Sequence, residues 1–191
     1  MVCAGLGLTV LTPIFLIIAL FIRLDSPGPI FFRQERAGKN GISFCIFKFR
    51  SMYVDPHPSK GYQRDHDLRI TKVGRWLRRL SLDELPQFIN IFKGEMSLIG
   101  PRPALLHQIE RYNAHQRHRL DVRPGITGWA QVNGRNALTW EEKIEFDTWY
   151  VAHCSPWLDL QILLKTAWAV LDQSGVYFHG QGSAWSTSSK E

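Results

Sequence analysis

The sequence predicts an α/β fold, a small mixed globular domain that follows an apolar N-terminal helix. Residues 1–22 carry no charged side chain, and Arg23 is the first charged residue. Two strand-like runs around a glycine-containing connection come next, and several later segments repeat apolar residues with the period of a helix. A chain of 191 residues is long enough for one domain with a buried core.

The N-terminal segment has the length of a membrane helix. A straight helix over residues 1–22 would reach about 33 Å, enough to cross a hydrocarbon core of about 30 Å. Thr12 and Pro13 lie at its centre, and proline removes a helical hydrogen bond, so a kink is expected there. Two arrangements remain open: a kinked spanning helix, and a helix–break–helix that enters and leaves on one face.

The next segment is expected to form a β-hairpin. Asp25–Pro29 is a turn that separates the apolar segment from the globular part. Ile30–Gln34 and Ile42–Phe49 are predicted strands, joined through Gly38–Gly41. Asp55–Gly61 is predicted to be a mobile loop that covers the functional site.

Two adjacent carboxylates, Asp83 and Glu84, follow an amphipathic helix predicted over Val73–Leu80. Three arginines precede them, and guanidinium groups bind phosphate oxygens bidentately. The carboxylates could then supply a nucleophile or a metal ligand. The three arginines are Arg75, Arg78 and Arg79.

The same acidic pair also fits a purely structural role. Ser81-x-x-Glu84 is a capping box, and either Ser81 or Asp83 could be the N-cap of a helix over Leu85–Phe92. Acidic residues in a first turn also offset the helix macrodipole. Spacing alone therefore does not decide between the two roles.

Regular elements are also predicted in the second half of the chain. Leu105–Leu120 is a candidate polar helix, and Arg123–Arg135 has too many Gly and Pro residues for regular structure. Its backbone N–H groups and arginines suit a diphosphate, and a rigid turn around a buried Trp129 is the alternative. Two further helices have clear N-terminal signals, Thr139-x-x-Glu142 and Ser155–Pro156, and run to Tyr150 and over Trp157–Leu171.

Seven tryptophans are a large number for this length. Because Trp favours membrane interfaces, the helices that carry it could lie flat on lipid headgroups, and core packing is the alternative. The residues concerned are Trp140, Trp149, Trp157 and Trp168. We assign residues 1–24 to the membrane segment, 25–176 to the globular domain and 177–191 to a disordered tail.

The charge predicts an acidic partner. The formal net charge is +6 and the isoelectric point is about 9.4, which suits nucleic acid, an anionic membrane or phosphorylated substrates. The basic residues are scattered, and no nucleic-acid-binding pattern occurs, so no nucleic-acid partner is expected. The three cysteines lack a C-x-x-C spacing and predict reduced thiols.

Several long motifs carry a resemblance to a known family. They are Phe32–Gly38, Phe47–Met52, Ser81–Pro103, Val122–Arg135, Phe146–Tyr150 and Trp157–Leu160. In this order and over most of the chain, they resemble the bacterial sugar transferases, the monotopic phosphoglycosyl transferases. The resemblance favours the re-entrant form of the N-terminal helix, broken at Thr12–Pro13. It also implies a place at the bacterial inner (cytoplasmic) membrane, with the catalytic domain on the cytoplasmic face and anionic lipid as a partner.

The resemblance implies transfer of a sugar-1-phosphate from a UDP-sugar to polyprenyl (undecaprenyl) phosphate. Asp83 would attack phosphorus, release UMP and form an aspartyl-phosphosugar intermediate. Mg²⁺ would be held by Asp83 and Glu84, and Glu84 would be the second metal ligand or the base for the lipid phosphate. Gly134–Ala137 resembles the branch that takes N-acetylated UDP-sugars. The expected substrate-binding residues are Arg78, Arg102, Arg123, Gln131 and Arg135.

Two other functions stay open on the residues alone. One is a non-enzymatic basic module at a membrane surface, in which the acidic pair only caps a helix. The other is the same transfer by direct displacement in a ternary complex, which differs from the two-step reaction in requiring the lipid before UMP leaves.

Overall fold

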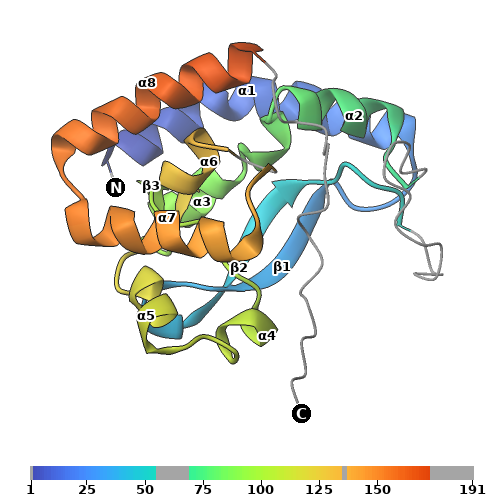
Figure 1. Ribbon diagram of the computed structural model, residues 1–191. Coiled ribbons are helices and arrows are strands. Elements are labelled where there is room, and N and C mark those ends of the chain that lie inside the picture. The colour runs from blue at the N-terminus through green and yellow to red at the C-terminus, as the bar shows by residue number, and fades with distance from the viewer. Residues whose placement is uncertain (1, 55–68, 135–136, 173–191) are drawn as a thin grey trace.

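The computed structural model describes residues 2–54, 69–134 and 137–172, with side chains described over 11–54, 69–134 and 137–169. Figure 1 shows the arrangement of these elements. In chain order they are α1 (Val2–Asp25), β1 (Phe31–Ala37), η1 (Lys39–Gly41), β2 (Ser43–Phe49), α2 (Lys72–Arg79), η2 (Leu82–Glu84), α3 (Gln87–Phe92), β3 (Ser97–Ile99), α4 (Leu106–Ile109), α5 (Ala114–Arg117), η3 (His118–Leu120), β4 (Gly125–Thr127), α6 (Trp129–Val132), α7 (Trp140–His153) and α8 (Pro156–Asp172). The predicted mixed α/β class is confirmed.

The predicted hairpin is present. Strands β1 and β2 pair antiparallel over their full lengths, from Phe31 opposite Phe49 to Ala37 opposite Ser43. Strand β1 continues three residues beyond the predicted end at Gln34, because the connection at η1 is tight. Asn40 and Gly41 both adopt positive φ there, at 56° and 75°.

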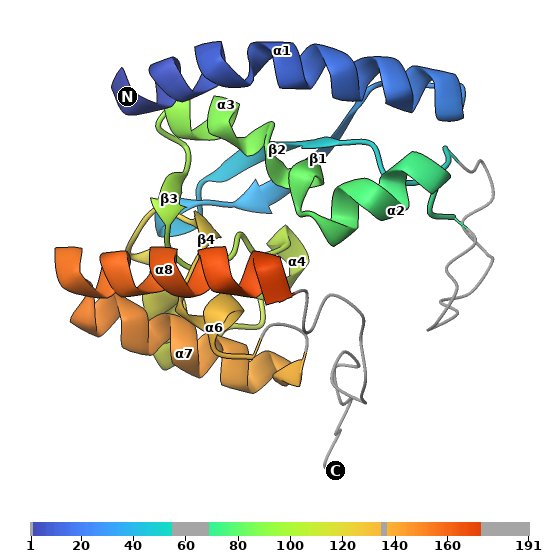
Figure 2. The same cartoon turned by 90° about the horizontal axis from the view of Figure 1, so that it is seen from above.

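Helix α1 runs without interruption through Pro13, and Figure 2 shows it as one continuous coil. The predicted break at Thr12–Pro13 does not divide the helix, and the re-entrant arrangement stays a prediction. Within the described part of the chain, no helix is both long and apolar enough to cross a membrane. The inner face of α1 packs against the globular domain through Ile18 and Ile22.

One core cluster joins α1, the hairpin and α2. Phe49 and Leu77 lie buried against the inner face of α1, and Leu82 and Leu85 pack against the same cluster. Arg50 is buried beside it and donates hydrogen bonds to the carbonyl oxygens of Ile22, Ser26 and Pro27. These bonds satisfy acceptor groups at the C-terminal end of α1. The apolar N-terminal helix is therefore fixed to the domain by both packing and hydrogen bonds.

The second half of the domain surrounds a short parallel pair of strands. Strand β3 pairs with β4 in register Ser97–Gly125 and Ile99–Thr127, and α6, α7 and α8 lie beside it (Figure 2). Thr139 caps α7 with the predicted capping box, and Ser155 accepts a hydrogen bond from Leu158 N at the start of α8.

Two predictions for this half were wrong in detail. Leu105–Leu120 is not one helix but three short ones, α4, α5 and η3. Asn113 is the reason, since its side chain accepts a hydrogen bond from Gln116 N at 2.8 Å and begins a new helix. Arg123–Arg135 is not wholly irregular either, since it contains β4 and α6.

The tryptophans divide between core and surface. Trp140 packs against Tyr112 and belongs to a buried cluster, so it follows the core alternative. Trp149 is half exposed and stacks on Trp129. Trp157 and Trp168 on α8 are exposed, as is Trp76 on α2. Asp55–Gly61, Arg135 and the tail from Gln173 onward lie outside the described residues.

Candidate active site

The acidic pair lies in the short 3₁₀ turn η2, between α2 and α3. Ser81 adopts a left-handed conformation at φ 55° and makes no side-chain capping bond, so the predicted capping box is wrong. Ser81 instead follows the C-cap of α2, the place where helices commonly end in a left-handed residue. Helix α3 begins only after Pro86, which is its N-cap without a side-chain bond. Neither Ser81 nor Asp83 is therefore the N-cap of α3.

The turn directs the two carboxylates away from the core. Leu82 and Leu85 flank the pair and pack into the cluster beneath α1. In a 3₁₀ turn, consecutive side chains point about 120° apart, so Asp83 and Glu84 face different neighbours.

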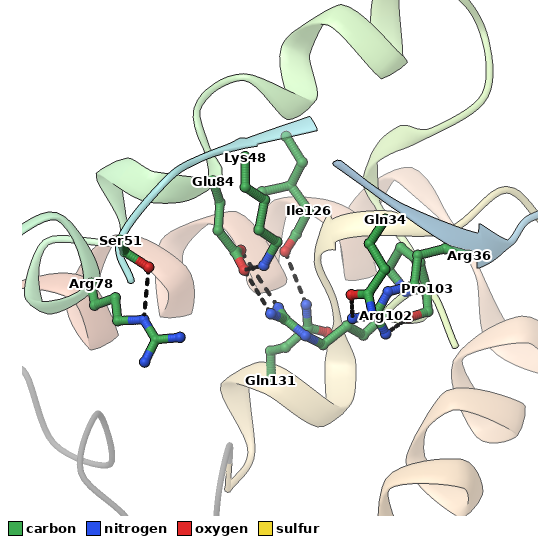
Figure 3. A network of polar contacts seen from close by, with 10 residues as sticks. All are labelled: Gln34, Arg36, Lys48, Ser51, Arg78, Glu84, Arg102, Pro103, Ile126 and Gln131. Atoms are coloured by element: carbon green, nitrogen blue, oxygen red, sulfur yellow. Dashed lines mark hydrogen bonds and ion pairs between the residues drawn. The ribbon is translucent and has the colours of Figure 1, made fainter. Parts of the chain in front are cut away.

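Glu84 forms the centre of a charged cluster (Figure 3). Its Oε1 atom lies 2.6 Å from Lys48 Nζ and 2.6 Å from Arg102 Nη2. Burial alone would raise the pKa of Glu84, but Arg102 and Lys48 outweigh it and hold the pKa at about 2. Burial in turn lowers the pKa of Lys48, and Glu84 opposes that effect. Glu84 is therefore an ionised carboxylate that orients two cations.

Asp83 differs from its neighbour. Across the described ranges, no group donates a hydrogen bond to its carboxylate and no cation lies in ion-pair contact with it. Burial and repulsion from Glu84 raise the pKa of Asp83 above its ordinary value, and the charges of Lys48, Arg78 and Arg102 offset only part of that increase. Asp83 is thus a partly buried carboxylate within a positive field, with its oxygens uncommitted.

Arg78 approaches the site from the last turn of α2. Its Nε atom donates a hydrogen bond to Ser51 Oγ at 3.1 Å, while the guanidinium nitrogens at its tip extend beyond (Figure 3). Ser51 is buried beneath the start of α2, where Thr71 N also bonds its carbonyl oxygen. The structure thus brings four predicted residues into one region: Arg78, Asp83, Glu84 and Arg102.

The other predicted binding residues either lie away from Glu84 or already form a hydrogen bond within the protein. Gln131 donates to Ile126 O at 2.9 Å, and its Oε1 atom is buried without a partner among the residues that the structure describes. Arg123 is exposed and lines an open cavity of about 570 Å³ together with Lys39, Tyr150 and Asp159. That cavity contains none of the residues around Glu84. Binding roles for Gln131 and Arg123 stay predictions.

Lys48 is a site residue that the sequence reasoning missed. It lies within the Phe47–Met52 motif, which alone predicts no role for it. A signal was present, because Phe44–Phe49 is an apolar strand and Lys48 is the charged residue within it. A lysine at such a position needs a partner when the strand is buried. Glu84, 36 residues away, is that partner.

The oxygen donors at the site suit Mg²⁺, which prefers carboxylates and substrate phosphates over a full set of protein ligands. Among the described residues, no cluster of three or more His, Cys, Asp or Glu side chains is placed to hold a metal. Asp83 has uncommitted oxygens, whereas Glu84 Oε1 already accepts from two cations. The donor set therefore fits a metal that is shared with a substrate diphosphate.

Comparison with known proteins gives a consistent result. Residues 1–173 match the model of the bacterial sugar transferase family. The sugar transferase EpsL of Bacillus subtilis is 49% identical over 155 residues, which cover 81% of this chain and 76% of EpsL.

Other relatives are longer than this chain. The UDP-glucose:undecaprenyl-phosphate glucose-1-phosphate transferase of Xanthomonas campestris pv. campestris is 45% identical over 186 residues, covering 92% of this chain and 38% of that protein. A UDP-N-acetylgalactosamine-undecaprenyl-phosphate N-acetylgalactosaminephosphotransferase of Aeromonas hydrophila is 42% identical over 180 residues, covering 90% of this chain and 42% of that protein. The chain thus spans about two fifths of these two relatives.

Proposed function

Because this chain belongs to the bacterial sugar transferase family, we propose that it transfers a sugar-1-phosphate from a UDP-sugar to undecaprenyl phosphate. The relatives support this reaction class, since two of them are named for transfer from UDP-glucose or UDP-N-acetylgalactosamine to this lipid. They differ in the sugar, so the identity of the donor sugar is left to experiment.

The observation that carries the mechanism is the unequal state of the two carboxylates. Glu84 is committed to Lys48 and Arg102, whereas the oxygens of Asp83 are free to react. Asp83 is therefore the nucleophile in our proposal. The cations around it favour the ionised form that attack requires, and they attract the negatively charged diphosphate of the donor.

The transfer then takes place in two displacements. An Asp83 carboxylate oxygen attacks the β-phosphorus of the UDP-sugar, the bond from that phosphorus to the bridging oxygen breaks, and UMP leaves with the oxygen. A phosphate oxygen of undecaprenyl phosphate next attacks the same phosphorus. The Asp83–phosphorus bond breaks, which restores the carboxylate and yields the undecaprenyl diphosphate sugar.

The other residues bind and orient in this proposal. Arg102 and Arg78 would contact phosphate oxygens, because guanidinium groups match phosphate geometry. Glu84 with a pKa of about 2 is a poor proton acceptor, so we assign it to holding Lys48 and Arg102. Asp83, with Glu84 as a further ligand, would hold Mg²⁺ together with the diphosphate, and the ion would neutralise charge on that group.

We also propose that the site operates at the membrane surface, where the lipid acceptor resides. Helices α1, α2 and α8 lie along the upper side of the molecule in Figure 1, away from the hairpin tip and α4. They carry exposed apolar side chains, including Leu20, Leu24, Trp76, Leu164 and Trp168. Such a surface suits contact with lipid, and the basic charge of the chain suits anionic headgroups.

The test is UMP release from a panel of UDP-sugars with Mg²⁺, measured with and without undecaprenyl phosphate. We expect one donor to give sustained release only with the lipid. Asp83→Asn should lower the rate by roughly 10³-fold or more, as loss of a nucleophile does in other enzymes. A variant that keeps the wild-type rate would exclude Asp83 as the nucleophile, and release that never precedes lipid binding would favour direct displacement.

A further inference from the structure

The segment Pro101–Ala104, which contains Arg102, is held by backbone-carbonyl hydrogen bonds at each of its four residues. Four successive carbonyl oxygens each accept a hydrogen bond, and the donors come from three separate parts of the chain. The donors to residues 101, 102, 103 and 104 are, in order, Gly125 N at 2.9 Å, Arg119 Nη2 at 3.0 Å, Arg36 Nη1 at 3.3 Å and Ala37 N at 2.9 Å.

Arg119 is the donor to Arg102 itself, and it is a buried side chain. It is 7% exposed, donates to Tyr112 Oη at 2.6 Å and pairs with Asp147, which is 2% exposed. If the Arg119 guanidinium moved, the buried carboxylate of Asp147 would lose its ion pair, and an unpaired buried charge strongly destabilises a folded protein. It is also shut off from substrate, so Arg119 is not itself a ligand of the reacting groups.

Arg36 fastens the same segment from the hairpin. Its Nη2 atom donates to Gln34 Oε1 at 2.7 Å while Nη1 contacts Pro103 O, as Figure 3 shows. The space enclosed between the hairpin, Arg102 and Arg119 is only about 10 Å³, room for roughly one water molecule. The backbone of Arg102 is thus held by bonds and by close packing.

The side chain of Arg102, by contrast, is 51% exposed. An exposed arginine loses side-chain entropy when it is held in one geometry, so exposed ion pairs are usually weak. Fixing the backbone reduces the number of conformations that place the guanidinium away from Glu84. The ion pair beside Asp83 therefore depends on the anchoring of the segment behind it.

We propose that Arg119, oriented by Asp147 and assisted by Arg36, is a positioning residue that fixes Arg102 for its contact with Glu84 and with substrate phosphate. This inference rests on the proposed transfer reaction. Arg119 then affects the rate of transfer only by holding Arg102 in place.

The experiment compares Arg119→Lys with Arg117→Lys, the same change at an exposed arginine of α5. Lysine keeps the charge beside Asp147 but lacks the planar fork that reaches the Arg102 carbonyl at the same time. We expect the kcat of UMP release to fall about 10- to 100-fold, with little change in KM for the donor. Arg117→Lys should remain within about twofold of the wild type.

A double-mutant cycle then separates positioning from general stability. In an Arg102→Ala background, Arg119→Lys should cause no further loss of kcat. Equal kcat for Arg119→Lys and Arg117→Lys, or losses that multiply in the double variant, would overturn the proposal. Should Arg119→Lys not fold, Arg36→Lys is the second variant, because it removes a half-buried donor to Pro103 and carries the same expectations.

A wild-type protein without UMP release from any donor would contradict the proposed function rather than the positioning. The positioning is then tested by thermal unfolding midpoints of Arg119→Lys, Glu84→Gln and the double variant. A smaller effect of Arg119→Lys in the Glu84→Gln background supports the connection through Arg102, and fully additive shifts would overturn it.

Discussion

At the scale of single residues, the site depends on a difference between the surroundings of two neighbouring carboxylates. Glu84 forms ion pairs with Lys48 and Arg102, whereas Asp83 is affected only by the charges of these residues at a distance. The sequence predicted the pair, together with Arg78 and Arg102, from their residue types and their motif. It did not predict the difference between the two carboxylates, because Lys48 reaches Glu84 across 36 residues of chain.

This difference predicts a specific pH dependence of stability. The pKa of Glu84 is about 2 in the folded protein against an ordinary value near 4.5, which corresponds to roughly 3 kcal/mol. Because the folded pKa is depressed, that contribution is complete above about pH 4.5 and is lost as the pH falls towards 2. Urea unfolding of metal-free protein between pH 2.5 and 6 measures it. Glu84→Gln should flatten this part of the profile, and an unchanged slope would contradict the assignment.

At the scale of elements, close backbone contacts set the position of the site. Gly74 in α2 lies against the backbone of Ser51, and a Cβ atom at this position would lie 2.0 Å from Ser51 O. This contact lets α2 bring Arg78 beside η2. The sequence predicted α2 from its amphipathic stripe, but an approach between residues 23 positions apart leaves no local pattern.

Gly74→Ala should therefore destabilise the protein and displace Arg78. Overpacking of this kind costs about 1–3 kcal/mol, and the kcat should fall as well. Arg75→Ala, on the exposed side of the same helix, is the matched control and should change the unfolding free energy little. Equal unfolding free energies for Gly74→Ala and the wild type would show that the contact is not required.

The errors in element prediction have a common cause. The sequence predicts a helix start at Ser81, but Ser81 directly follows the C-cap of α2. It also predicts one helix over Leu105–Leu120, but Asn113 begins a new helix within that run. Ser and Asn bond the backbone at either kind of helix end, so their local signal is ambiguous. Ser81 and Thr139 both have a glutamate three residues later, but only Thr139 directly precedes a long helix, α7.

At the scale of the whole molecule, three helices with exposed apolar side chains lie along the upper side of Figure 1. Trp157 and Trp168 are 68% and 71% exposed on α8, α1 carries exposed leucines, and α2 carries the exposed Trp76. The sequence left interfacial and core roles both open for the tryptophans and could not sort them. Burial separates Trp140, which packs against Tyr112, from the two exposed ones.

Tryptophan quenching by brominated lipid measures this orientation in vesicles of phosphatidylethanolamine and phosphatidylglycerol. Replacing Trp76, Trp157 and Trp168 together by Phe should remove most of the lipid-dependent quenching, because all three are exposed and interfacial Trp side chains lie at headgroup depth. Trp140→Phe should leave the quenching almost unchanged. The reverse order of effects would place the lipid on a different side of the molecule.

The central claim is that Asp83 forms a covalent bond to phosphorus, and intact-protein mass spectrometry tests it most directly. The protein is incubated with its UDP-sugar donor and Mg²⁺, without lipid, and quenched in acid. The account predicts a mass increase equal to one phosphosugar, mapped to Asp83, absent in Asp83→Asn and removed by undecaprenyl phosphate. Lipid-dependent turnover with no adduct in an active preparation, or an adduct that persists in Asp83→Asn, would contradict it.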